Sequence, residues 1–236
     1  FLTSMNLLCG FLAILINDPI WSFYSVLIGI AFDFVDGFSA RMLKVPSLFG
    51  KELDSLADMV SFGVVPGFLY YHHVLADGSG PSLLFSLKLF VATLIPVLAA
   101  LRLAKFNVND SGKIGFEGLP SSAAALAIIS IPFIIAQEKQ AGNISEITSS
   151  FLNSDWLMLL VPFLLALLMV SKLPLFNFKS FKGGLKGNWV QLLYVISLVL
   201  LIIIFKENIW YCIPLSIAWY VILSLITIPF WRKKFD

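Results

Sequence analysis

The sequence predicts an all-α integral membrane protein, a polytopic bundle of about eight transmembrane helices forming one domain over residues 1–236. Hydrophobic residues make up 59% of the chain and charged residues 13%, and the mean hydropathy is +0.92. A soluble domain carries roughly 25% charged residues. Apolar segments near the spanning length of about 20 residues also recur along the whole sequence. These observations exclude an ordinary soluble domain.

The apolar segments are separated by short polar connections. The expected spans are residues 3–17, 20–42, 52–75, 82–106, 120–137, 155–172, 189–205 and 208–230. The chain starts at Phe1 and runs directly into apolar sequence, which indicates a truncated or processed start rather than a cleavable signal peptide. Two longer connections are expected, a polar one at 138–154 and a basic, glycine-rich one at 173–188.

The distribution of basic residues predicts the topology. An even number of spans places both termini on one side, and thirteen of the sixteen Lys and Arg residues then fall in the connections and tail on that side. Lys88, Lys139 and Lys206 fall on the other side. Because basic residues accumulate on the cytoplasmic side, we expect a protein of the cytoplasmic membrane with both termini and the active site facing the cytoplasm. Lysines of the 173–188 connection would contact anionic headgroups, with substrate binding as an alternative.

Four carboxylates lie in or beside the second and third apolar segments. Asp33 and Asp36 are three residues apart and Asp54 and Asp58 four apart, so each pair lies on one face of its helix. Ionisable groups at membrane depth are costly and mark functional sites. Two such faces turned toward each other would form a cage of oxygen ligands, which suits magnesium or manganese. The sequence therefore predicts bound divalent cations.

The carboxylates belong to a longer pattern of fixed positions within residues 33–58. The pattern consists of Asp33, Asp36, Gly37, Ala40, Arg41, Gly50, Asp54 and Asp58. It resembles the full signature of the CDP-alcohol phosphatidyltransferases, membrane enzymes that move a phosphatidyl group from a CDP-activated lipid onto an alcohol. The resemblance implies a six-helix core and two divalent cations bridging the diphosphate of the donor.

The resemblance also implies roles for the acidic residues. Asp33, Asp36 and Asp54 would supply most of the metal ligands. Asp58 would contact a metal as well and accept the proton of the attacking hydroxyl, as the catalytic residue. Its contribution would come from placement against the hydroxyl rather than from basicity, because a neighbouring cation favours the charged form of a carboxylate.

The other motif positions are expected to bind the CDP-lipid. By resemblance, Gly37 and Ala40 leave room for the cytidine and its phosphate, with tight helix packing as the alternative. Arg41 can offer a forked set of donors to phosphate oxygens or clamp an acidic ligand. Gly50 is expected to give the connection its turn and to keep space above the site.

Two polar residues of the first segment are further candidates for the nucleotide site. Thr3 and Asn6 can reach the same cavity from residues 3–17. A plain hydrogen bond between helices is an equally good explanation of both.

Residues 100–122 are the expected acceptor-specificity region. The stretches 100–107 and 115–122, together with 50–63, look like the corresponding parts of bacterial and archaeal phosphatidylserine synthases. Arg102 would bind the carboxylate of serine, and Asn107 its ammonium or carboxylate group. Alternatively, Arg102 only anchors its helix at the lipid headgroups.

The expected activity is transfer of the phosphatidyl group of CDP-diacylglycerol to L-serine, giving phosphatidylserine and CMP. The same chemistry with glycerol 3-phosphate or inositol phosphate remains open, because Arg102, Lys105 and Lys113 could meet an acceptor phosphate. A cation transporter is an alternative of another class, although inverted repeats or broken helices would then be expected. The expected partners are both substrates, membrane lipids and a second copy in a homodimer, with no nucleic acid.

Overall fold

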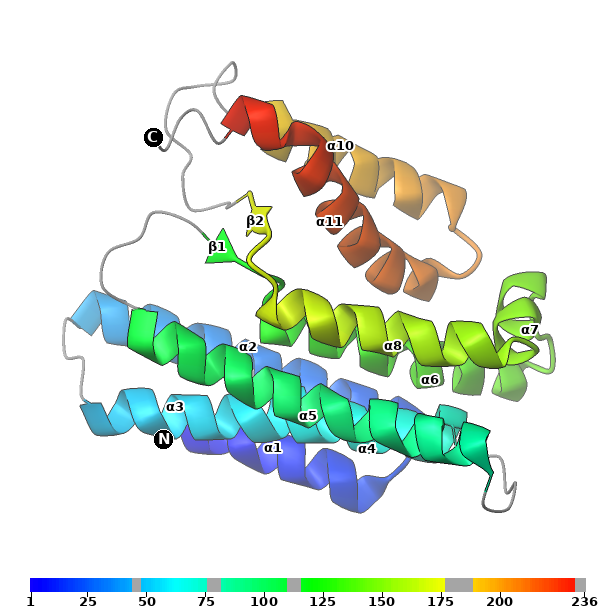
Figure 1. Cartoon of the computed structure of the whole chain (residues 1–236), viewed down its shortest axis with the longest axis horizontal. Helices are drawn as coiled ribbons and strands as arrows, with labels where there is room; N and C mark the ends of the chain where they lie inside the picture. The colour runs from blue at the N-terminus through cyan, green and yellow to red at the C-terminus, as the bar shows by residue number, and fades with distance from the viewer. Residues whose placement is uncertain (44–47, 76–81, 110–115, 177–188, 232–236) are drawn as a thin grey trace.

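The computed structural model describes residues 1–43, 48–75, 82–109, 116–176 and 189–231. Within these ranges the chain is almost entirely helical, which confirms the predicted class (Figure 1). Two strands of two residues each, β1 (Phe116–Glu117) and β2 (Pro174–Leu175), pair antiparallel. They join the segment before α6 to the segment after α8.

All eight predicted apolar segments coincide with helical residues. The α-helices are α1 (Leu2–Ile16), α2 (Pro19–Leu43), α3 (Leu48–Met59), α4 (Val65–Tyr70), α5 (Leu83–Asn109), α6 (Ser121–Ala141), α7 (Glu146–Leu152), α8 (Asp155–Val170), α10 (Trp189–Ile204) and α11 (Cys212–Trp231). The π-helical turn η1 (Val60–Val64) joins α3 to α4 in one continuous rod, which the π-helical turn η2 (Tyr71–Leu75) extends beyond α4. The 3-10 turn η3 (Ile209–Tyr211) leads into α11.

Four helical stretches are long and apolar enough to cross a membrane. They are Pro19–Ser39, Leu83–Val108, Ser121–Ala141 and Ile209–Ile228. The bent pair of α7 and α8, with an angle of 91° between its parts, would make a fifth, while α1 and α10 are apolar but shorter. The chain is therefore an integral membrane protein, and the count of eight spans stays a prediction.

The connection expected at residues 138–154 is largely helical. Helix α6 continues to Ala141 and ends at Gly142, whose φ of 69° is the left-handed conformation that glycine adopts most easily. Helix α7 then begins after Ser145, whose hydroxyl accepts a hydrogen bond from the main-chain amide of Thr148. A helix this short and polar carries no hydropathy signal, which is why the sequence pattern missed it.

A buried carboxylate holds this end of the bundle together. Glu138 of α6 is 5% exposed and accepts hydrogen bonds from the Tyr211 hydroxyl at 2.6 Å and from Asn208 Nδ2 at 3.1 Å. The amide and hydroxyl of Ser145 also donate to it. Charge-assisted bonds of this kind are stronger than neutral ones. They fasten α6 to the start of α7 and to η3.

Helix packing defines a main bundle and an outlying hairpin. Helix α1 lies along α2, α5 lies beside α8, and α6 contacts α2, α4 and α11. Small residues allow the closest approach: a Cβ added at Gly67 of α4 would lie 2.7 Å from the main-chain oxygen of Ala92 in α5. Helices α10 and α11 form a hairpin in which α11 contacts α6 and β2 (Figure 1).

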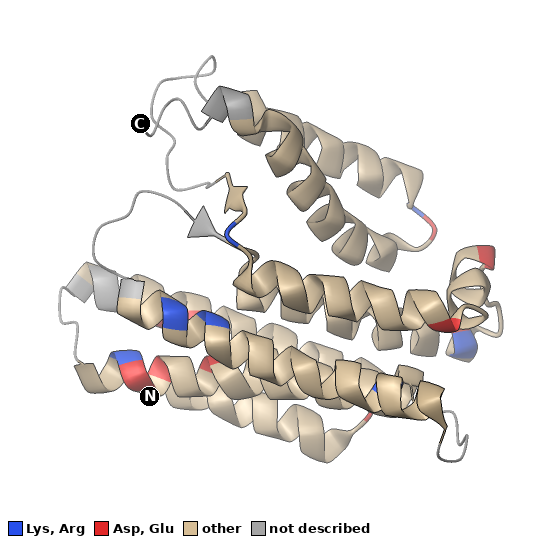
Figure 2. Cartoon of the chain, viewed as in Figure 1, with Lys and Arg blue, Asp and Glu red and all other residues tan. Residues whose placement is uncertain are grey.

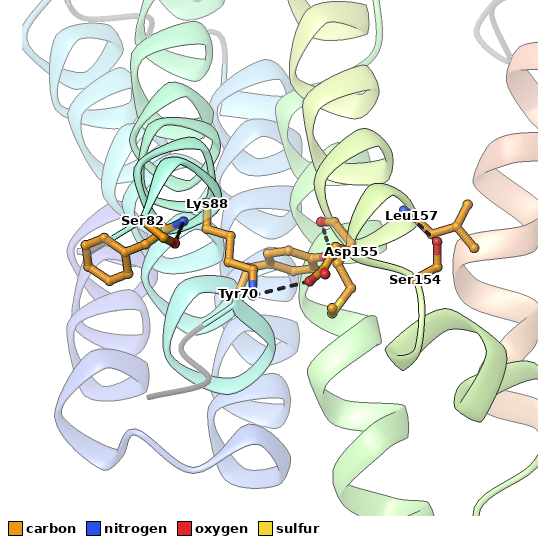
Figure 3. Close-up of polar contacts among 8 residues, drawn as sticks. Tyr70, Ser82, Lys88, Ser154, Asp155 and Leu157 are labelled. Atoms are coloured by element: carbon orange, nitrogen blue, oxygen red, sulfur yellow. Dashed lines mark hydrogen bonds and ion pairs between the residues drawn. The ribbon is translucent and has the colours of Figure 1, made fainter. Parts of the chain in front are cut away.

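Charged residues gather toward the ends of the bundle. Figure 2 shows acidic residues on α3 and basic residues on α5 near the same end, close to the N-terminus. Toward the other end, Lys88 of α5 is 1% exposed, and its Nζ lies 3.4 Å from Asp155 Oδ1 of α8. Nearby, the Tyr70 hydroxyl donates to the Met158 carbonyl at 2.8 Å (Figure 3). This polar cluster links α4, α5 and α8.

Candidate active site

Three of the motif carboxylates converge where α2 faces α3. Asp33 of α2 and Asp54 and Asp58 of α3 each offer one oxygen atom, and these three atoms lie within 4.8 Å of one another. All three residues are half-buried. The spacing of four residues puts Asp54 and Asp58 on one face of α3, and α1 packs against both α2 and α3. The predicted convergence of the two helix faces is thus present for three residues.

The fourth carboxylate is placed differently. Asp36 is half-buried on α2 and accepts a hydrogen bond from the Thr3 hydroxyl of α1. Among the described residues, the group of potential metal ligands contains Asp33, Asp54 and Asp58 but not Asp36. Two residues on one helix face point to the same side, but their side chains need not reach the same neighbouring helix. Asp36 bonds to α1, whereas Asp33 lies with the carboxylates of α3.

Helix α1 contacts the motif at two points. Thr3 bonds to Asp36, and Asn6 Nδ2 donates to Asp58 Oδ1 at 3.1 Å. Both residues are buried, Asn6 completely. The two polar residues of the first segment therefore bond to motif carboxylates across helices, the alternative left open by the sequence, and their role in nucleotide binding stays a prediction.

The cluster has the donor chemistry of a site for hard cations. None of the described basic side chains forms a salt bridge with Asp33, Asp54 or Asp58. Several carboxylates held this close repel one another unless a positive charge lies between them. Oxygen-only ligand sets favour magnesium, calcium and manganese over softer metals. The residues present fit a divalent cation.

The small and basic positions of the motif are only partly described. Gly37 is exposed on α2. The main chain of Ala40 and Arg41 continues α2, but their side chains lie outside the described part of the structure. Gly50 corrects one expectation, because it lies in the first turn of α3 rather than in a turn of the connection. The helix begins at Leu48, four residues before the apolar segment expected from residue 52, because Lys51 lowers the local hydropathy without disfavouring a helix.

The predicted acceptor residues lie on α5 beside the carboxylates. Arg102 Nη1 donates to the Ser121 hydroxyl of α6 at 3.0 Å, and its guanidinium interacts electrostatically with Asp58. Its Nε is buried and has no hydrogen-bond partner among the described residues. Asn107 Nδ2 donates to the Ser55 hydroxyl of α3 at 2.7 Å.

The two serines were not singled out from the sequence. Ser55 directly follows Asp54, and Ser121 directly follows the Gly-Leu-Pro triplet of the acceptor region. Their positions next to motif residues are the signal that could have identified them. Serine is too common in loops and helix starts for that signal to be specific.

Comparison with known proteins agrees with the family resemblance of the motif at residues 33–58. The family model of the CDP-alcohol phosphatidyltransferases matches residues 1–168, which contain α1 to α8 up to its last residues. The CDP-diacylglycerol–serine O-phosphatidyltransferase of Methanocaldococcus jannaschii is 35% identical over 183 residues, 77% of this chain and 75% of that protein.

Two further relatives extend the comparison. The enzyme of the same name from Helicobacter pylori is 31% identical over 76% of this chain and 68% of that protein. The archaetidylserine synthase of Methanothermobacter thermautotrophicus is 33% identical over 64% of this chain and 61% of that protein. With three of the four motif carboxylates gathered between α2 and α3, these matches show that the chain belongs to the CDP-alcohol phosphatidyltransferase family.

Proposed function

We propose that this chain transfers the phosphatidyl group of CDP-diacylglycerol to the hydroxyl of L-serine, producing phosphatidylserine and CMP for phospholipid biosynthesis. The observation that carries the proposal is the convergence of Asp33, Asp54 and Asp58, with one oxygen of each within 4.8 Å of the others. Arg102 interacts electrostatically with Asp58 in this group. The names of the relatives support serine as the acceptor.

Divalent cations complete the site in this proposal. Asp33, Asp54 and Asp58 would hold one ion, and Asp36 would contribute to a second. Bound magnesium or manganese would neutralise the charge of the donor diphosphate and stabilise the departing phosphate oxygen. The cluster of Asp33, Asp54 and Asp58 supports one such site, and the second ion is part of what we propose.

The protein side chains would direct the transfer itself. The serine hydroxyl oxygen forms a bond to the phosphorus that carries the diacylglycerol, and its proton passes to the Asp58 carboxylate. The bond from that phosphorus to the bridging oxygen breaks, and CMP leaves with the electron pair. Positioning of the two reactants would supply much of the rate acceleration.

The CDP moiety would lie along the motif side of α2. Gly37 and Ala40 would allow its close approach, Arg41 would bind phosphate oxygens, and Gly50 would leave space at the start of α3. Thr3 borders the same region through its bond to Asp36. Asn6, the other candidate of the first segment, is hydrogen-bonded to Asp58.

Serine recognition would come from α5. A guanidinium is suited to a carboxylate because it offers several donors in a fixed plane. The buried Nε of Arg102 is a donor with no partner among the described residues, and in this proposal the carboxylate of serine would supply one. Asn107 would bind the ammonium group or the carboxylate from five residues further along α5.

The basic residues support a location in the cytoplasmic membrane with the site and both termini facing the cytoplasm. Homodimer formation stays a prediction of the family resemblance.

A substrate panel tests the proposal. Purified protein is supplied with CDP-diacylglycerol, magnesium or manganese, and serine, glycerol 3-phosphate or inositol phosphate in turn, and CMP release is measured. We expect CMP formation that depends on serine. Release with a phosphorylated alcohol instead would reassign the acceptor, and a cation transporter would release no CMP with any of them.

A further inference from the structure

The side chain of Asn6 is committed to Asp58. It is completely buried, and its Nδ2 donates to Asp58 Oδ1 at 3.1 Å. Its Oδ1 is also buried and has no hydrogen-bond partner in the described ranges. A Cβ added at Gly29 of α2 would lie 3.1 Å from this Oδ1, so the atom is enclosed between α1 and α2. Buried amides are normally satisfied at both ends, so stability alone does not explain this residue.

The main chain of Asn6 is held as well. The Ser61 hydroxyl donates to the Asn6 carbonyl at 3.0 Å, and Ser61 is completely buried. Ser61 lies three residues after Asp58, in the π-helical turn η1. A Cβ at Gly10 would lie 3.0 Å from Ser61 Cα, so α1 and η1 meet almost backbone to backbone. Two bonds from neighbouring turns of the α3–η1 rod therefore fix Asn6, one through its side chain and one through its carbonyl.

The electrostatics of the cluster explain why a neutral donor is useful here. Asp33 and Asp54 lie close enough to repel the Asp58 carboxylate. Arg102 already interacts electrostatically with Asp58, and a lysine or arginine bonded to Asp58 in the place of Asn6 would compete further with a cation for its charge. The amide of Asn6 binds Oδ1 and leaves the charge in place. Within the described residues, Oδ2 of Asp58 accepts no hydrogen bond.

We propose that Asn6 is a positioning residue for the transferase reaction. Its amide fixes the Asp58 carboxylate through Oδ1 and leaves Oδ2 free of hydrogen bonds from described residues, for the cation and the acceptor hydroxyl, while the bond from Ser61 sets the depth of α1 against the motif. The inference rests on the proposed function, in which Asp58 accepts the hydroxyl proton.

The variant Asn6→Leu removes the donor and keeps a similar volume. Misplacing a general base commonly costs one or two orders of magnitude, so kcat for CMP release is expected to fall about tenfold to a hundredfold. The Kd for CDP, measured by calorimetry with magnesium and without acceptor, and the KM for CDP-diacylglycerol are expected to stay within about threefold, because in this proposal the amide acts on Asp58 and not on the nucleotide. A weaker Kd with kcat preserved would mean that Asn6 binds the nucleotide, and would overturn the proposal.

Two serine variants form a matched pair. Ser25 of α2 donates to the Cys9 carbonyl of α1 at 2.8 Å, the same kind of bond that Ser61 makes to Asn6. Ser61→Ala is expected to lower kcat about threefold to tenfold, and Ser25→Ala to change it less than about twofold, since only Ser61 is tied to the residue that holds Asp58. Equal effects would show general helix packing and overturn the proposal.

If Asn6→Leu does not fold, the comparison of Ser61→Ala with Ser25→Ala still tests whether Asn6 positions Asp58. Wild-type protein in the same assay separates a failure of the positioning role of Asn6 from a failure of serine as the proposed acceptor. If it releases no CMP with serine, the acceptor assignment has failed, and the comparison is repeated with the alcohol that the substrate panel identifies.

Discussion

Arg102 and Ser121 join α5 to the first residue of α6, with Nη1 of the guanidinium 3.0 Å from the serine hydroxyl. One edge of the guanidinium is thereby fixed, and its Nε stays without a partner among the described residues. The same group interacts electrostatically with Asp58. This geometry couples the predicted acceptor region to the carboxylate cluster.

Arg102→Lys should selectively impair serine binding. Lysine keeps the charge but cannot both bond to Ser121 and offer a planar fork to a carboxylate. We expect the KM for serine to rise at least about tenfold, which corresponds to about 1.4 kcal/mol, while the KM for CDP-diacylglycerol changes little. Steady-state CMP release measured against each substrate gives both constants.

Lys105→Gln is the control for Arg102→Lys, since Lys105 lies one turn further along α5. It should leave the KM for serine within about twofold. If the two variants behaved alike, the basic charge of this helix end rather than Arg102 would be the determinant.

Asp58→Asn should separate binding from chemistry. The amide cannot accept the proton of the attacking hydroxyl, so CMP release should fall at least about a thousandfold. CDP-diacylglycerol should still bind, as measured by calorimetry. Glu52→Gln is the matched control, because Glu52 is exposed on the same helix, and it should retain normal turnover. Normal CMP release by Asp58→Asn would remove Asp58 from the role of proton acceptor.

Removing divalent cations should stop the reaction reversibly. The cluster formed by Asp33, Asp54 and Asp58 is rich in oxygen ligands, and in our proposal it needs a cation to approach the donor diphosphate. Excess EDTA should abolish CMP release, and added magnesium or manganese should restore it. Full turnover in excess chelator would argue against a metal-dependent site.

Tyr211→Phe should weaken the far end of the bundle without changing catalysis. The lost hydroxyl donates to the buried Glu138 carboxylate, and charge-assisted bonds contribute roughly 1.5–3 kcal/mol. Tyr220→Phe is the matched control, because its hydroxyl donates to the neutral Phe176 carbonyl at 2.7 Å, a bond of roughly 1 kcal/mol. Thermal unfolding in detergent should show the larger fall in Tm for Tyr211→Phe, with kcat unchanged in both. A larger loss for Tyr220→Phe would contradict this ranking.

The sequence by itself determined the class of the protein and the chemistry of its motif. Long apolar segments are informative because the bilayer imposes a length and a composition on each span, and all eight segments proved helical. The charges between Asp33 and Asp58 indicated a functional site because charge inside apolar sequence is rare, and the full pattern of fixed positions resembled the family signature. The short helix α7 escaped prediction because seven residues are too few for a periodic pattern.

The tertiary structure decided which residues meet. Helical spacing fixes the face of a side chain but not its distance from the next helix, so only the packing of α1, α2 and α3 separated Asp36, bonded to Thr3, from the other three carboxylates. The bonds from Asn6 to Asp58 and from Asn107 to Ser55 join residues 52 positions apart. Such contacts depend on the depth and rotation of whole helices, which are set by packing across the bundle and leave no local pattern in the sequence.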